Sequence, residues 1–171
     1  MPPYLRFSAF DVSSHLYWRG VCRVIIGRLS LVVLIFYGSE LPPPGRFCGD
    51  FVRDALRSAI AKVKQAQLFL IAAWVLLPDH LHCLWAFPEG DTDVSTGWIK
   101  IKCLVSIACA ENYHRPDLMS VSKQKLREST IWQRQFYERQ IRDDRDFSQH
   151  SDYAHVNPIK HGLVSNARDW S

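Results

Sequence analysis

The spacing of apolar residues predicts one helix and one hairpin in the middle of the chain. Between residues 50 and 66 apolar side chains recur at helical spacing, with basic side chains largely between them, and Asp50 is expected as the N-cap. The apolar run 69–77 predicts a buried strand, which a Pro-Asp pair ends. Residues 80–87 then predict a second strand that pairs back on the first.

The second half of the chain continues with two more helices and one more strand. A helix capped by Ser95 is predicted to run to about residue 112, and the polar stretch 113–130 is expected to be irregular. Residues 131–141 predict a strand, and 145–156 predict a helix that an Asn-Pro pair ends. This order of elements favours an α+β fold, in which the helices pack on one face of an antiparallel sheet.

A long apolar stretch, residues 21–38, lies near the N-terminus. Two arginines interrupt it, and the clean run 29–37 is much shorter than the ~20 apolar residues of a membrane-spanning helix. It lacks the basic start and small-residue end of a signal peptide. We therefore interpret it as one or two buried strands and expect a cytoplasmic protein without a membrane contact.

Composition and charge narrow the class of protein only slightly. A chain of 171 residues with 47% hydrophobic and 22% charged residues suits one soluble domain with a real core. The net charge of +4 permits nucleic-acid binding without requiring it. The five cysteines are odd in number and form no CxxC motif, which favours buried free thiols in a reducing compartment over disulfides or a structural zinc site.

The most informative chemistry is the pair His80 and His82 on the second predicted strand. Side chains two residues apart on a strand point to the same face. Two imidazoles on one face can clamp a divalent metal, and two polar rings on a mostly apolar strand cost free energy unless they are used. The alternative is a pair of partly exposed histidines without a ligand.

A second candidate site lies near the end of the chain, where Tyr153 and Asn157 are four residues apart and so share one helix face. The amide oxygen of Asn157 can serve as a third metal ligand. A phenol is largely protonated at neutral pH, so a tyrosine nucleophile needs a nearby metal or basic group. Alone, a tyrosine at such a position is more often structural.

Aromatic and basic residues alternate in the segment 132–139, a mixture that suits stacking on single-stranded bases and binding of phosphates. An ordinary amphipathic edge strand is the alternative. A weaker pattern of the same kind occurs at 98–102. The residues predicted to contact DNA are Trp98, Lys100, Lys102, Trp132, Arg134 and Arg139, together with Arg142 and Lys160 further along the chain.

Five segments together resemble the REP-associated tyrosine transposases, a branch of the HUH single-strand transposases. They are AWVLLPDHLHCLW (73–85), PEGD (88–91), IWQR (131–134), IRDDRDF (141–147) and DYAHVNPIKHGLV (152–164). Their order and spacing match as well. The resemblance covers about residues 50–170 and is highly specific.

The resemblance implies both a fold and an activity. It implies a ferredoxin-like α+β sandwich in which His80, His82 and Asn157 hold a divalent metal ion, Mg or Mn, and Tyr153 is the nucleophile. It also implies single-stranded DNA with palindromic hairpins as the partner, cut through a 5′-phosphotyrosine that leaves a free 3′-hydroxyl. The expected protein is a transposase or nickase, as a monomer or homodimer.

The chain departs from the family pattern in two places. Residues 8–45 lack the Gly-Gly-Thr-Tyr-Phe-Phe-like first strand, and Arg139 stands where the family usually has His. We therefore divide the chain into an atypical N-terminal region (1–45) and a transposase domain (46–171), and take residues 24–37 as the best substitute first strand beside the histidine strand. Two other function classes stay open, a decayed transposase that only binds hairpin DNA and a metal-dependent hydrolase that uses water.

Overall fold

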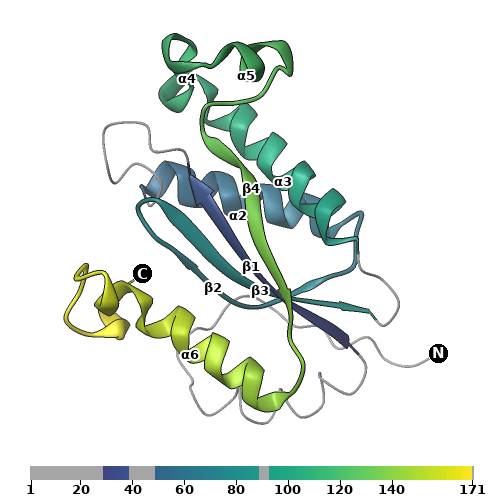
Figure 1. Cartoon of the computed structure of the whole chain (residues 1–171), viewed down its shortest axis with the longest axis vertical. Coiled ribbons are helices and arrows are strands. Elements are labelled where there is room, and N and C mark those ends of the chain that lie inside the picture. The colour runs from purple at the N-terminus through teal and green to yellow at the C-terminus, as the bar shows by residue number, and fades with distance from the viewer. Residues whose placement is uncertain (1–28, 39–48, 89–92, 171) are drawn as a thin grey trace.

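The computed structural model describes residues 29–38, 49–88 and 93–170, which build an antiparallel sheet with helices on both faces (Figure 1). The strands in chain order are β1 (Leu29–Gly38), β2 (Leu70–Leu76), β3 (His80–Pro88) and β4 (Trp132–Gln140). Their order across the sheet is β2-β3-β1-β4, and all neighbours are antiparallel.

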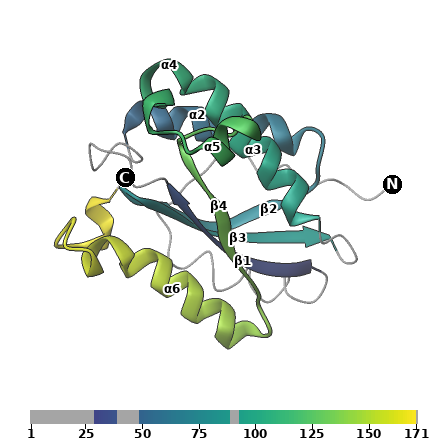
Figure 2. The same cartoon turned by 45° about the horizontal axis from the view of Figure 1, so that its top comes forward.

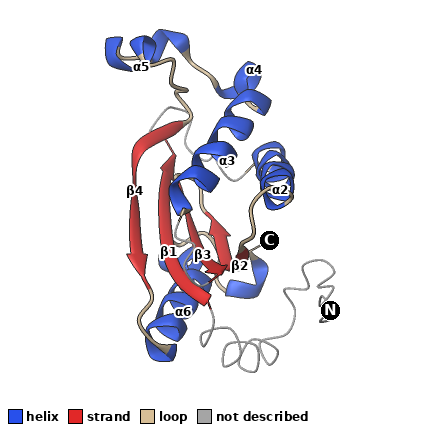
Figure 3. Cartoon of the chain, turned by 90° about the vertical axis from the view of Figure 1, so that its right-hand side faces the viewer, coloured by secondary structure: helices blue, strands red, loops and turns tan. Residues whose placement is uncertain are grey.

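The helices divide into two layers. The α-helices are α2 (Asp50–Lys64), α3 (Val94–Ala108), α4 (Ala110–Tyr113), α5 (Val121–Lys125) and α6 (Asp144–Lys160), with 3-10 turns η2 (Pro116–Leu118) and η3 (Ala167–Asp169). Figures 2 and 3 show α2 and α3 on one face of the sheet and α6 on the opposite face. The order from β1 to β4 follows the βαββαβ pattern of ferredoxin-like folds. The predicted α+β class is confirmed.

The prediction that all helices pack on one face was wrong for the third one. Strand β3 is buried from His80 to Phe87, so both of its faces need a cover. Trp85 and Phe87 pack with the residues of α2 and α3, whereas Leu84 and Ala86 pack with α6. A central strand that is apolar on both faces requires helices on both sides, because each exposed apolar face would cost free energy.

The elements agree with the sequence-based expectations in kind except in the stretch 113–130, which was expected to be irregular and contains η2 and α5. Some ends also differ. Helix α6 was expected to end before Asn157 but continues through Pro158 to Lys160. Asn157 and Pro158 are both buried, so packing holds the last turn in place although proline lacks an amide N–H. The cap of α3 is the side chain of Asp93, which accepts a hydrogen bond from the Thr96 amide, and the predicted Ser95 cap was wrong.

The predicted N-terminal strand is part of the sheet. Strand β1 lies between β3 and β4, and its residues Ile35 and Tyr37 are opposite His82 and His80. The expectation of a first strand from residues 24–37 beside the histidine strand is therefore confirmed for the part that is described. The rest of the atypical region 1–45 lies outside the described residues.

The expectation of buried free thiols is met at two of the three described cysteines. Among the described cysteines, Cys83 and Cys109 are buried and Cys103 is exposed, and all three are free thiols. Cys22 and Cys48 lie outside the described residues. Within the described ranges no helix has the length and apolar character needed to cross a membrane.

Candidate active site

Strand β3 presents His80 and His82 on the face that α6 covers. The centroids of their rings lie 4.8 Å apart. Both residues are buried, His80 with 6% and His82 with 5% of its surface exposed. Leu81, which lies between them, belongs to the core on the other face. The prediction that both histidines share one face of a central strand is confirmed.

Each ring has a hydrogen-bond partner beside it. The Nδ1 of His80 donates to the Asp79 carboxylate at 2.7 Å, which leaves Nε2 as the basic nitrogen of that ring. Burial, and to a smaller extent the charges of His80, His161, His150 and Lys160, together lower the pKa of His82 to about 4. His82 is therefore neutral at pH 7, the form that binds a metal.

Asn157 is completely buried beside His82. Its Nδ2 donates to His82 Nε2 at 3.0 Å, and its Oδ1 has no hydrogen-bond partner among the described residues. A buried amide oxygen without a partner costs about 1–3 kcal/mol. The predicted donor set of His80, His82 and Asn157 therefore fits a divalent cation, since a buried amide oxygen beside His82 is left without a partner.

The acidic ligands common in metal sites play no part here. Across the described ranges, no three His, Cys, Asp or Glu side chains are grouped so that they could hold a metal ion. Any cation at this site would thus depend on an amide oxygen for its third protein ligand. Two neutral imidazoles and an amide carry no negative charge, so a bound divalent cation would keep its full attraction for phosphate.

Tyr153 lies one turn before Asn157 on α6 and reaches the same site. Its ring contacts His82 edge-on at 5.4 Å, and its hydroxyl accepts a hydrogen bond from Lys160 Nζ at 3.2 Å. The lysine ammonium is also 4.8 Å from the centre of the tyrosine ring. Tyr153 is 38% exposed, so its hydroxyl can be reached from solvent while the Lys160 ammonium lies beside it.

A cleft of about 640 Å³ opens beside these side chains. It is lined by His82 and Tyr153 and by residues from the end of β4 and the first turns of α6, among them Tyr137, Arg139 and Asp146. An extended polar chain can therefore approach the tyrosine hydroxyl along basic side chains. This arrangement suits an anionic polymer better than a small apolar ligand.

Comparison with known proteins identifies the family. No family model matches the chain. It is 42% identical over 115 residues to the REP-associated tyrosine transposase of Escherichia coli (strain K12), covering 67% of this chain and 59% of that protein. It is 37% identical over 121 residues to a putative REP-associated tyrosine transposase of Haemophilus influenzae (strain ATCC 51907 / DSM 11121 / KW20 / Rd), covering 71% and 66%.

A solved structure of a REP-associated tyrosine transposase bound to a REP hairpin matches with a TM-score of 0.67 and 34% identity, over 84% of this chain and 74% of that one. The chain belongs to the REP-associated tyrosine transposase family. It spans less than two thirds of the length of the two curated relatives. The family resemblance of the five sequence segments is thereby confirmed.

For this family member, the structure separates the predicted DNA contacts into three groups. Trp98 and Trp132 are 1% and 5% exposed and pack against each other in the core under α2 and α3. Their prediction as base-stacking residues was wrong, because neither ring faces solvent. Lys102 is also turned inward, since its Nζ donates to the backbone carbonyl of Gln133 at 2.8 Å.

The other predicted contacts are on the surface. Lys100 is exposed on α3, and Arg134 is exposed on β4, where Glu128 and Ser122 accept its hydrogen bonds. Neither lines the cleft. Arg139 and Arg142 do line the cleft, and Lys160 contacts the hydroxyl of Tyr153.

Four residues of the site were missed by sequence reasoning. Tyr137, 46% exposed, is the aromatic side chain of the segment 132–139 that lines the cleft. Asp146 and His150 line it from α6, and the ring of His161 lies 5.3 Å from that of His80. The spacing of Asp146, His150 and Tyr153 along one helix face was a usable signal.

The inward position of Lys102 leads to a stability prediction. The pKa of Lys102 is lowered to about 8. Burial is the main cause; the negative charge of Glu128 opposes it, and the positive charge of Lys123 adds to it. Between pH 8 and about 10.5 the unfolded chain binds more protons at this residue than the folded chain, so the free energy of unfolding rises with pH there. Lys102→Met is expected to raise Tm at pH 7 by about 2–4 °C and to remove that rise.

Thermal unfolding from pH 7 to 10.5 measures this effect, with Lys100→Met as the control because Lys100 is an exposed lysine on the same helix. An unchanged pH profile in Lys102→Met would show that Lys102 stays charged in the folded protein over this range.

Proposed function

We propose that this protein is a transposase or nickase that binds single-stranded hairpin DNA and cleaves and rejoins it by transesterification through Tyr153. The observation that carries the proposal is the meeting of Tyr153 with His82 and Lys160 at the edge of an open cleft. Kinship with a REP-associated tyrosine transposase solved in complex with a REP hairpin supports the choice of substrate.

In the proposed reaction the Tyr153 oxygen attacks a DNA phosphorus. A bond forms between that oxygen and phosphorus, and the bond from phosphorus to the 3′-oxygen breaks, so the products are a 5′-phosphotyrosine and a 3′-hydroxyl. Lys160, 3.2 Å from the attacking oxygen, holds that oxygen in place. The phenol proton goes to solvent, and the leaving 3′-oxygen takes up a proton from solvent. Rejoining is the same exchange in reverse, with a 3′-hydroxyl as the attacking group.

The proposed cofactor is a divalent metal ion, Mg or Mn, held by His80, His82 and Asn157. When bound, such an ion supplies Lewis-acid polarisation of a phosphate oxygen. The neutral state of His82 and the unpartnered Oδ1 of Asn157 support these ligands. Imidazole ligands favour Mn over Mg, because Mg prefers oxygen donors.

The presence of β1 supports an enzyme over a binding module without activity. A catalytic sheet needs a rigid strand beside the histidines, and β1 pairs with β3 along its whole length, from Leu29 opposite Pro88 to Tyr37 opposite His80. The departure from the family pattern in the N-terminal region therefore leaves the backbone support of the histidine strand in place.

The deciding experiment is a cleavage assay with an end-labelled DNA hairpin that carries single-stranded flanks. With Mn we expect a covalent protein–DNA adduct on a denaturing gel, and we expect no adduct with EDTA or with the same DNA annealed to its complement. Hairpin binding without any cut would instead identify a binding module, and cleavage without an adduct would identify a hydrolase that uses water.

A further inference from the structure

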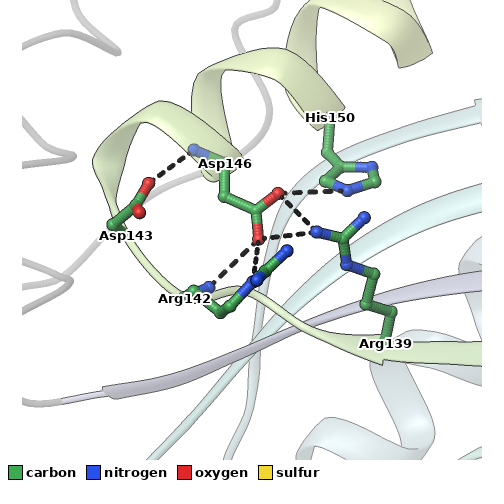
Figure 4. Close-up of polar contacts among 5 residues, drawn as sticks. All are labelled: Arg139, Arg142, Asp143, Asp146 and His150. Carbon is green, nitrogen blue, oxygen red and sulfur yellow. Dashed lines mark hydrogen bonds and ion pairs between the residues drawn. The ribbon is translucent and has the colours of Figure 1, made fainter.

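The carboxylate of Asp146 is the centre of a polar cluster at the start of α6, beside the cleft (Figure 4). Arg139 Nη2 donates to its two oxygens at 3.0 and 3.3 Å, and the backbone N–H of Arg142 donates to Oδ2 at 3.2 Å. His150 Nε2 lies 3.5 Å from Oδ1. The side chain of Asp146 is only 10% exposed, so these donors replace most of its water contacts.

The charge state of this cluster follows from its neighbours. Burial acts to raise the pKa of Asp146, but the Arg142 N–H and the charges of Arg139, His150 and Arg142 hold this pKa below its usual value. Asp146 is thus a carboxylate at neutral pH. It anchors the guanidinium of Arg139 by a charge-assisted hydrogen bond, which is stronger than a neutral one.

Arg139 keeps donors that the protein does not use. A guanidinium has five N–H donors, and within the described ranges only Nη2 of Arg139 makes hydrogen bonds. The Arg139 side chain is 33% exposed and lines the same cleft as Tyr153 and His82. A guanidinium that is held through one nitrogen, on a side chain that lines a cleft, is suited to bind a phosphate group.

A purely structural role at the start of α6 does not account for the cluster. The N-cap of α6 is Asp143, whose Oδ1 accepts the backbone N–H of Asp146 at 2.8 Å. The first turn of the helix therefore has its cap without the Asp146 side chain. That side chain accepts one hydrogen bond from the Arg142 backbone N–H just before the helix, and it also pairs with Arg139 at the end of β4.

We propose that Asp146 is a positioning residue that holds Arg139 so that the free donors of Arg139 bind one phosphate of a single strand lying in the cleft, next to the phosphate that Tyr153 attacks. This inference rests on the proposed function for the identity of the strand. It adds a residue that makes no contact with DNA itself.

Simple electrostatics and a positioning role make opposite predictions for the effect of Asp146→Asn on DNA binding. By simple electrostatics, removing a negative charge beside DNA should strengthen binding. A positioning role predicts weaker binding, because Arg139 loses the anchor that holds its orientation. We expect about fivefold weaker binding of an unstructured oligonucleotide for Asp146→Asn and about tenfold for Arg139→Gln, measured by fluorescence anisotropy.

Two further measurements test whether Asp146 acts through Arg139. The double variant should bind no more weakly than Arg139→Gln alone, since a positioning residue has no effect once its target is gone. The slope of log affinity against log salt should fall by about 0.7 for Arg139→Gln, the value for one phosphate contact on a single strand.

The matched control is Asp117→Asn. Asp117 accepts two hydrogen bonds from Arg115 in an exposed Arg–Asp pair of the same chemistry outside the cleft. This variant should leave oligonucleotide binding unchanged. Thermal unfolding of every variant separates binding effects from loss of fold.

The outcomes distinguish this inference from the proposed function. Unchanged or tighter binding by Asp146→Asn, or additive losses in the double variant, would overturn the positioning role even if the wild-type protein forms the covalent adduct. Non-additive losses of oligonucleotide binding would support it even if no adduct ever forms. A wild-type protein that binds no single strand would overturn both.

Discussion

Tyr153→Phe is expected to abolish the covalent adduct with hairpin DNA while changing hairpin affinity by no more than about threefold, or about 0.7 kcal/mol. The variant removes the attacking oxygen and its hydrogen bond with Lys160. It keeps the ring that contacts His82, and the residue is more than a third exposed, so the fold should tolerate the change. Adduct formation on a denaturing gel and binding by fluorescence anisotropy measure the two effects separately.

Tyr113→Phe is the control for this substitution. Tyr113 stacks on Phe51 and packs against the core on the face of the sheet opposite to α6. Loss of its hydroxyl should therefore leave adduct formation intact. Cleavage by Tyr153→Phe at the wild-type rate would remove Tyr153 as the nucleophile and favour a hydrolase that uses water. A loss of both binding and cleavage would mean that the hydroxyl serves to bind DNA.

Saturating Mn is expected to stabilise the wild-type protein against heat. A ligand present at 100 times its Kd adds about 2.7 kcal/mol to the free energy of unfolding, which raises Tm by about 5–10 °C in a protein of this size. Asn157→Leu should lose most of that shift, because it replaces the buried amide oxygen by an apolar group of similar volume. Thermal unfolding with Mn and with EDTA gives the comparison directly.

The same variant separates metal binding from folding. With EDTA, Asn157→Leu loses the hydrogen bond to His82 but also the unpartnered Oδ1, so its Tm should stay close to that of the wild type. His155→Ala, an exposed histidine on the same helix, should keep the full Mn shift. If Asn157→Leu kept it as well, the third ligand would lie elsewhere, and His161 beside His80 would be the next residue to test.

Local periodicity was enough to predict the parts of the site that lie on a single element. Alternation along a strand places His80 and His82 on one face, and helical spacing places Tyr153 and Asn157 one turn apart. Both relations depend only on backbone geometry over a few residues. The five sequence segments also sufficed to predict the family, and the comparisons confirmed it.

Tertiary packing decided which aromatic side chains face solvent. Trp98 shares a helix face with Ile101 and Val105, and all three are buried in one core. This periodic signal was present in the sequence, but the basic residues near Trp98 favoured a DNA contact. Burial depends on which neighbours cover a face, and those neighbours are distant in the sequence.

The sequence by itself determined the succession of elements, the pairing of the two histidines and the spacing of the tyrosine and the asparagine. Only the tertiary structure decided that α6 covers the histidine face of the sheet, that Asn157 reaches His82 across 75 residues of chain, and that Asp146 anchors Arg139. The physical reason is that strand and helix periods constrain side chains within one element. Contacts between elements instead depend on how the apolar faces of the whole chain are covered at once.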